Sequence, residues 1–298
     1  MKQLILFLKG MAMGGANVIP GVSGGTVAFI TGIYERLINA LKSIDLESLK
    51  LFFSGKFVTF AERIDLKFLA ILFLGVFVSI LSLAKALELA LANYEVLTLS
   101  FFFGLIVASI VAVSRQIEDI GLSTIISFCA GAAIAVSIAF LPPAASNDSF
   151  LYLTLCGVVA VCSMILPGLS GSYILLLMGN YLLVLRAVSS FDFTIMLPMV
   201  LGCIVGLITL SRLLSYLFSN FKDQTVGTMV GFVAGSLLII WPWKTTLYES
   251  FDGKEKAVGY VWNLPEMDTR FLISLGLMLG GFFLVLWMER KPKEEVSD

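Results

Sequence analysis

Apolar runs of about 17–20 residues recur along the whole chain, and each is long enough to cross the hydrocarbon core of a membrane as a helix. Of the 298 residues, 58% are hydrophobic and only 14% are charged, whereas a soluble domain averages about 45–50% apolar and about 25% charged. The mean hydropathy is +0.97. The chain is therefore predicted to be an all-α polytopic membrane protein.

Two loops of the same pattern interrupt the apolar runs. The first reads Pro20-Gly21-Val22-Ser23-Gly24-Gly25-Thr26, and the second reads Pro167-Gly168-Leu169-Ser170-Gly171-Ser172-Tyr173. Pro-Gly ends a helix, and a serine that follows is a favoured first cap of the next one. We expect Ser23 to cap the segment that runs on from the first loop. Two such loops in one membrane protein indicate that they face each other across a transport site.

The chain is predicted to consist of two halves, 1–145 and 146–298. Each half is expected to hold a helical hairpin broken at Pro-Gly, followed by three transmembrane helices. The hairpin arms are expected at Gln3–Ile19 with Ser23–Leu41, and at Phe150–Leu166 with Gly171–Val188. The six further helices are expected at Phe68–Leu91, Leu97–Ser114, Gly121–Leu141, Phe193–Phe218, Thr225–Trp243 and Arg270–Met288.

Two polar stretches separate these segments. The stretch 42–67 carries phenylalanines among its charges, which predicts an amphipathic helix on the membrane surface. The stretch 244–269 is expected to be a polar loop.

The two halves are related by an internal repeat. A shift of 147 residues aligns the two loops, and it also aligns Gly10 with Gly157. Further along, a shift of 127 residues aligns Gly75 with Gly202. The change of 20 residues is about the length of the polar stretch that the second half lacks. These two shifts indicate a duplication.

The repeat predicts inverted topology. Each half crosses the membrane three times if its hairpin re-enters and five times if both arms span, and both counts are odd. Inverted repeats with broken helices are typical of secondary transporters. Twelve Lys and Arg residues fall on the side of the N-terminus and four on the other side, so both termini are predicted to be cytoplasmic. Neither loop tip carries a charge, which favours re-entry over exposure to water.

The loops have the composition of an anion site. A helix start presents free N–H groups, glycines allow a ligand to approach the backbone, and serine and threonine hydroxyls add donors. The predicted site therefore comprises Pro20, Gly21, Ser23, Gly24, Gly25, Thr26, Pro167, Gly168, Ser170, Gly171, Ser172 and Tyr173. The alternative interpretation is a plain helix break with a serine cap in a glycine-packed bundle.

Four charged residues are further candidates, either for contacting a phosphate or for coupling to a proton or sodium ion. Lys85 and Arg212 are repeat-equivalent and lie in apolar helices, where a cation is a functional candidate. They could instead reach the membrane surface with their long side chains. Glu35 and Arg36 lie near one interface, where Glu35 could carry a proton or the two could form an ordinary interfacial pair.

Several other kinds of site are not expected. The chain has no histidine, which removes the commonest general base and zinc ligand, and its four cysteines lie singly in apolar segments. No metal, cofactor or nucleic-acid partner is predicted. The first segment has no cleavage site and is expected to remain in the mature protein.

At its two loops the sequence resembles a bacterial family of undecaprenyl-phosphate translocases. The resemblance rests on Gly10 to Arg36, with Pro-Gly-Val-Ser-Gly-Gly-Thr and Gly-Ile-Tyr-Glu-Arg, and on Leu166 to Tyr181. It implies a protein of the bacterial plasma membrane that returns undecaprenyl phosphate from the outer to the inner leaflet for reuse in peptidoglycan and other envelope polymers. It also implies that the substrate and the surrounding lipids are the partners and that the protein is not an enzyme.

Two other functions remain open at this point. Undecaprenyl-pyrophosphate phosphatases also have inverted repeats and Pro-Gly-x-Ser motifs, but a serine without a positioned base is a poor nucleophile, and these loops hold no Arg, His or Glu. A transporter of small anions would need much the same loops.

Overall fold

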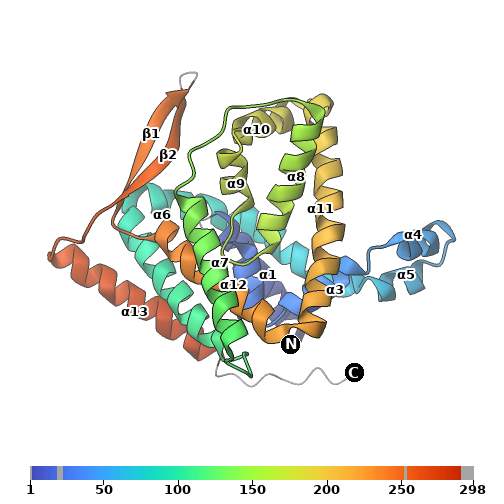
Figure 1. Cartoon of the computed structure of the whole chain (residues 1–298), viewed down its shortest axis with the longest axis horizontal. Helices are drawn as coiled ribbons and strands as arrows, with labels where there is room; N and C mark the ends of the chain where they lie inside the picture. The colour runs from blue at the N-terminus through green and yellow to red at the C-terminus, as the bar shows by residue number, and fades with distance from the viewer. Residues whose placement is uncertain (1, 19–22, 252–253, 290–298) are drawn as a thin grey trace.

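The computed structural model describes residues 2–18, 23–251 and 254–289, and helices dominate this part of the chain (Figure 1). The helices are α1 Lys2–Val18, α2 Gly24–Ile30, α3 Tyr34–Lys42, α4 Leu46–Phe53, α5 Phe57–Arg63, α6 Leu66–Ser114, α7 Leu122–Ala139, α8 Phe150–Ile165, α9 Gly171–Leu177, α10 Tyr181–Ser190, α11 Phe193–Asn220, α12 Lys222–Ile240 and α13 Thr269–Glu289. The strands are β1 Lys244–Phe251 and β2 Lys254–Trp262.

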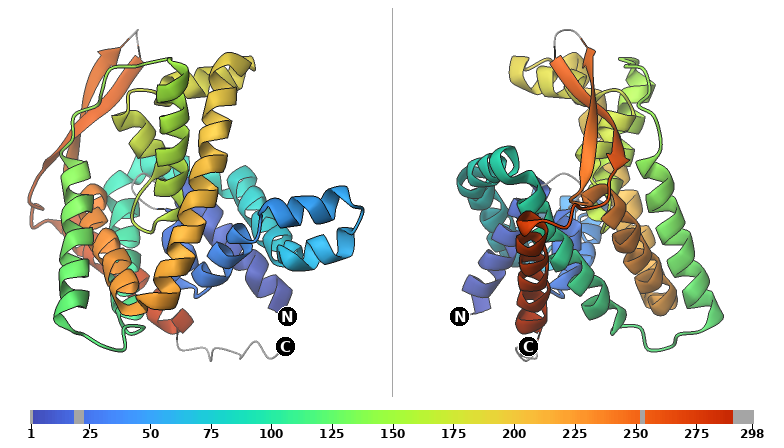
Figure 2. Two further views of the ribbon diagram at one scale, coloured as in Figure 1. Left: turned by 45° about the vertical axis from the view of Figure 1, so that its right-hand side comes forward. Right: turned by 90° about the vertical axis from the view of Figure 1, so that its left-hand side faces the viewer.

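Length and hydropathy confirm a polytopic helical architecture. Among the described residues, five helices could each cross a membrane, and up to seven spans result if two bent pairs are counted. The predicted helices before and after residue 94 form one long element, α6, whose backbone leaves helical geometry at Tyr94. The start of α1 and the end of α13 lie toward the same end of the molecule, and the strands project from the opposite end (Figure 2).

The second arm of each hairpin is broken, which corrects the prediction of a single helix. In the first hairpin this arm bends at Gly32, with φ +70°. In the second hairpin it bends at Gly179, with φ +74°. Helices α9 and α10 meet at 116°. Only glycine adopts positive φ readily, so these two glycines set the two elbows. As a result α2 and α9 are each only seven residues long.

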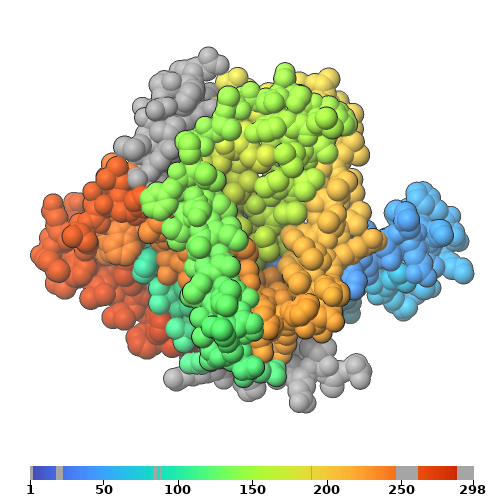
Figure 3. Space-filling view, viewed as in Figure 1, coloured from blue at the N-terminus to red at the C-terminus, as the bar shows by residue number. Residues whose placement is uncertain are grey.

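The polar stretch 42–67 forms two short helices rather than one. Helices α4 and α5 stand apart from the body (Figure 3), joined at Gly55 with φ +73°. Arg63 donates to Asp45 at 2.8 Å and to Glu47 at 2.6 Å across this pair. The hydrogen bond from Arg63 keeps the pKa of Asp45 below its usual value. Phe53, 82% exposed, and other apolar side chains remain uncovered, as an amphipathic surface element requires.

The stretch 244–269 is not merely a loop, because β1 and β2 pair as an antiparallel hairpin. This small sheet is an addition to the predicted all-α architecture and lies beyond the end of α12. Lys244 begins β1, and its ammonium donates to the Ile239 carbonyl in the last turn of α12. Burial lowers the pKa of Lys244 to about 8, while the nearby Glu95 opposes this shift.

Glycines bring the helices of each half together in the same way. A Cβ at Gly10 of α1 would overlap the Leu72 carbonyl of α6, and a Cβ at Gly157 of α8 would overlap the Met199 carbonyl of α11. Residues 10 and 157 differ by 147, and residues 72 and 199 differ by 127, which are the two shifts of the sequence repeat. The packing of α1 on α6 thus recurs as the packing of α8 on α11.

The later helices pack across the two halves. Gly104 of α6 lies against the Met278 backbone of α13, and Gly231 of α12 lies against the Phe128 backbone of α7. Gly104 and Gly231 are equivalent by the shift of 127 residues. Each half therefore has a helix that packs against a helix of the other half. The largest buried cluster lies where α2, α3 and α6 meet α11 and α12, and it includes Phe29, Leu72, Leu210 and Val226.

The connector between α7 and α8 is fastened to the second elbow by Asn180, which is fully buried. Its Oδ1 accepts from the Ser146 hydroxyl at 3.1 Å and from the Asn147 N–H at 3.0 Å. Its Nδ2 donates to the Asn147 carbonyl at 2.7 Å. The Ala144 N–H adds a bond of 2.7 Å to the Leu177 carbonyl.

The close helix contacts at glycines predict different effects on stability for two alanine substitutions. Gly104→Ala should lower the stability of the purified protein by about 1–3 kcal/mol, because the new Cβ collides with the α13 backbone. Gly276→Ala, on the open side of α13 where nothing lies within 4 Å, should be neutral or stabilising. Thermal unfolding in detergent compares the two. Equal melting temperatures for both variants would contradict this packing.

Candidate functional site

The two Pro-Gly loops, far apart in sequence, touch each other. The Ser23 hydroxyl donates to the Met164 carbonyl at 3.0 Å, and the Gly168 N–H donates to the Thr26 hydroxyl at 2.9 Å. Each bond joins a side chain of the first loop to the backbone of the second hairpin, one at the last turn of α8 and one at Gly168. The structure therefore brings together the described parts of both predicted loops.

Close approach explains the glycines at this contact. A Cβ at Gly25 would overlap the Ile165 carbonyl oxygen, and a Cβ at Gly171 would lie 2.6 Å from the Ala160 carbonyl oxygen. Gly168 has φ +82° and lies against the Phe232 backbone of α12. No side chain fits at these positions without moving the backbone of a neighbour.

The first loop is closed upon itself. Ser23 caps α2 as predicted, because its hydroxyl oxygen accepts from the Gly25 N–H at 3.1 Å. The Gly24 N–H donates to the Asn17 Oδ1 at 2.7 Å, and the Thr26 N–H donates to the Ser23 carbonyl at 2.9 Å. The first three N–H groups of α2 are thus all paired, and residues 23–26 are buried.

The second loop is more open. Ser172 is exposed, Ser170 is half-buried, and their hydroxyls lie 3.0 Å apart. Unlike Ser23, Ser170 makes no side-chain cap. The N–H groups of Gly171, Ser172 and Tyr173 find no acceptor among the described residues. This loop therefore presents several hydrogen-bond donors that an anion could accept, whereas Pro167, Gly168 and Leu169 are buried beneath it.

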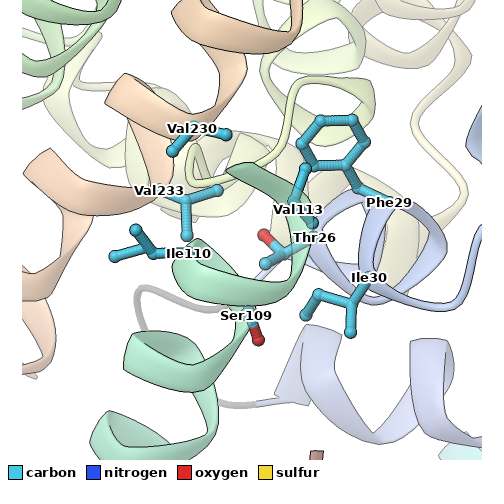
Figure 4. Close-up of a pocket in the computed structure, with 8 residues that line it drawn as sticks. All are labelled: Thr26, Phe29, Ile30, Ser109, Ile110, Val113, Val230 and Val233. Atoms are coloured by element: carbon cyan, nitrogen blue, oxygen red, sulfur yellow. The ribbon is translucent and has the colours of Figure 1, made fainter. Parts of the chain in front are cut away.

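A narrow crevice borders the contact between α2, α6 and α12. Figure 4 shows Thr26 at its centre among apolar side chains. The lining residues are Thr26, Phe29, Ile30, Ser109, Ile110, Val113, Val230 and Val233. The crevice is too tight for a water molecule.

The predicted charged residues do not gather at the loops. Arg36 forms a two-point ion pair with Asp65, at 2.6 and 3.2 Å, and stacks on the Phe68 ring with 4.5 Å to the centroid. Glu35 and Arg212 are exposed. Arg36 therefore pairs with Asp65 at the start of α6, and not with Glu35 as the interfacial interpretation had it.

Part of the prediction falls outside the described residues. Pro20 and Gly21 do so entirely, and so does the side chain of Lys85, whose backbone belongs to α6.

The structure also reveals two polar residues that the sequence analysis passed over. Asn17 reaches across the helix break to Gly24, and Lys9 donates to the Thr31 carbonyl at 2.7 Å. In the second half, Tyr152 donates to the Met178 carbonyl, which is equivalent to that of Thr31. The signal in the sequence was a polar side chain inside an apolar segment, but only the folded hairpin shows its partner.

Metal ligands are not clustered in the part of the chain that the structure describes. No group of three or more His, Cys, Asp or Glu residues there could hold an ion. The chemistry available at the loops is therefore hydrogen bonding by hydroxyls and backbone N–H groups.

The contact between Thr26 and Gly168 predicts the effect of removing one hydroxyl. Thr26→Val keeps the size of the side chain but leaves the buried Gly168 N–H without an acceptor. We expect it to lower the free energy of unfolding by about 1–3 kcal/mol. Thr26→Ser keeps the acceptor and should cost less. Thermal unfolding in detergent measures both, and a serine variant as unstable as the valine variant would contradict the role of the hydroxyl.

Comparison with known proteins agrees with the resemblance seen in the sequence. A family model described as VCA0040-like, undecaprenyl phosphate translocase-like, matches residues 13–258. A Vibrio cholerae protein named polyprenyl-phosphate transporter is 39% identical over 299 residues, covering 97% of each chain. A Staphylococcus aureus protein of the same name is 29% identical over 311 residues, again with 97% of each chain covered. No solved structure matches. The chain therefore belongs to the VCA0040-like, undecaprenyl phosphate translocase-like family.

Proposed function

We propose that this protein transports a polyprenyl phosphate, and specifically that it moves undecaprenyl phosphate from the outer to the inner leaflet of the bacterial plasma membrane. One observation carries the proposal. The two loops meet in the protein, and the second presents the Ser170 and Ser172 hydroxyls together with three backbone N–H groups that have no acceptor in the described structure. The names of the relatives supply the class of substrate.

The physical task explains why such loops are needed. A polyprenyl tail can stay in lipid while its phosphate crosses, but a bare phosphate in hydrocarbon is prohibitively costly. Hydroxyls and backbone N–H groups replace the water that the phosphate loses. Glycines at the loops let the phosphate oxygens come close to the backbone.

The proposed topology is two inverted repeats with re-entrant hairpins. The recurring packing of α1 on α6 and of α8 on α11 supports the duplication. Helices α2 and α9, at seven residues each, extend only about 10 Å, whereas a membrane core is about 30 Å thick. Such short helices after the break fit hairpins that enter and leave the membrane on the same side. The distribution of Lys and Arg favours cytoplasmic termini.

Alternating access follows from these features. In this conformation the first loop is buried against the second, and the second is partly exposed. Movement of one hairpin against the other would separate the loops and expose the phosphate to each leaflet in turn. A proton or sodium gradient could drive the cycle, with Glu35 as a candidate carrier at the interface.

Two rival functions make different predictions. A phosphatase of the related fold would release free phosphate, yet the loop serines contact each other and the backbone rather than a base. A transporter of small anions would carry inorganic phosphate without any lipid. We favour the lipid because both relatives are named polyprenyl-phosphate transporters.

Purified protein in liposomes tests the proposal. The liposomes contain undecaprenyl phosphate, and a membrane-impermeant reagent outside consumes the lipid phosphate. We expect the protein to make the inner-leaflet pool accessible without release of free phosphate. Release of phosphate would indicate the phosphatase. If half the lipid stays protected with folded protein and with each ion gradient imposed, lipid transport is refuted, and uptake of inorganic phosphate then tests the small-anion function.

The glycines of the loops give a sharper prediction. Gly171→Val and Gly24→Val should each reduce lipid transport at least about tenfold, because the new side chain collides with the Ala160 carbonyl in the first variant and with the Asn17 side chain in the second. Both variants should still insert into the membrane. Gly276→Val, on the open face of α13, is the matched control and should transport normally. Wild-type rates for both loop variants would refute binding at the loops.

A further inference from the structure

Asn17, in the last turn of α1, reaches across the first helix break. Its carboxamide oxygen accepts the Gly24 N–H at 2.7 Å, which is among the shortest hydrogen bonds at the loops. The side chain is half-buried, and its Nδ2 lies 2.8 Å from where a Cβ of Gly24 would be. The carboxamide therefore lies flat against the backbone of the first loop.

The second loop lacks this contact. The shift of 147 residues places Met164 where the first half has Asn17, and it places Gly171 where the first half has Gly24. A thioether is only a weak acceptor, and the Gly171 N–H has no acceptor among the described residues. Asn17 thus supplies one of the three hydrogen bonds that close the first loop, and Met164 supplies no counterpart in the second.

We propose that Asn17 is a positioning residue that gates the first loop by occupying the Gly24 N–H in place of a phosphate oxygen. This inference rests on the proposed function, in which the loops hold the phosphate of the lipid. In the conformation described here the phosphate meets the open second loop first. The first loop accepts it only after Asn17 has released Gly24.

The chemistry of the carboxamide suits this exchange. Its oxygen accepts the Gly24 N–H as a neutral acceptor, in the position that a charged phosphate oxygen would take. A bond between neutral groups is weaker than a bond from an N–H group to a charged phosphate, by a factor of about two. The resting contact is therefore strong enough to close the loop and weak enough to yield to the substrate.

Exchanging the two equivalent side chains tests the proposal. Asn17→Met should tighten the binding of a short-chain polyprenyl phosphate to the detergent-purified protein by about two- to tenfold, because one competing neutral hydrogen bond is lost. Met164→Asn should weaken binding by a similar factor, because the new carboxamide can tie the Gly171 N–H. Met164 is 51% exposed, so the smaller asparagine leaves no buried cavity there. The double variant should return toward the wild-type affinity.

A purely structural role for Asn17 gives a different result. A residue that only braces the hairpin would, on replacement by methionine, lower the melting temperature and weaken or leave unchanged the binding of the lipid. Unchanged or weaker binding in Asn17→Met, or wild-type binding in Met164→Asn, overturns the gating role while leaving the proposed function intact. Wild-type protein that binds no polyprenyl phosphate overturns the proposed function and the gating role with it.

Discussion

The hydrogen bonds between the two loops are the contact on which the rest of the structure depends. A broken helix inside a membrane leaves N–H and carbonyl groups that lipid cannot satisfy, so such breaks persist only where protein surrounds them. Here Thr26 accepts from the Gly168 N–H and Ser23 donates to the Met164 carbonyl, so side chains of the first loop satisfy backbone groups at the break of the second hairpin. The same contact is polar and close-fitting.

Close helix contacts at glycines hold the loops in that position. Gly10 lets α1 lie directly on α6, and Gly157 lets α8 lie directly on α11. The two loops come directly after α1 and α8, so this packing also fixes where the loops lie. Because van der Waals packing is a main attraction between helices in lipid, contact at small residues largely sets the helix positions. The later helices close across the two halves at Gly104 and Gly231, so neither half folds around its own helices alone.

Much of this fold is predictable from the sequence, and the failures have physical reasons. Hydropathy locates the membrane helices, and the repeat identifies the loops and the cap at Ser23. The elbows at Gly32 and Gly179 were missed because a glycine needed for positive φ looks the same in sequence as a glycine needed for packing. The β1–β2 hairpin was missed because a polar segment carries little periodicity. Asn17 was missed because its role depends on a partner across a helix break, and such a contact has no fixed spacing.

Asn180 fastens the connector between the halves to the second elbow, and this has a mechanical consequence. Four hydrogen-bonding groups of the connector are tied to the hairpin or to Asn180 itself, so the elbow cannot move away from the connector without breaking them. The equivalent residue of the first half is Ile33, whose side chain cannot hydrogen-bond. The second elbow is thus tied to the connector by a buried carboxamide, and the first elbow is instead packed by an apolar side chain.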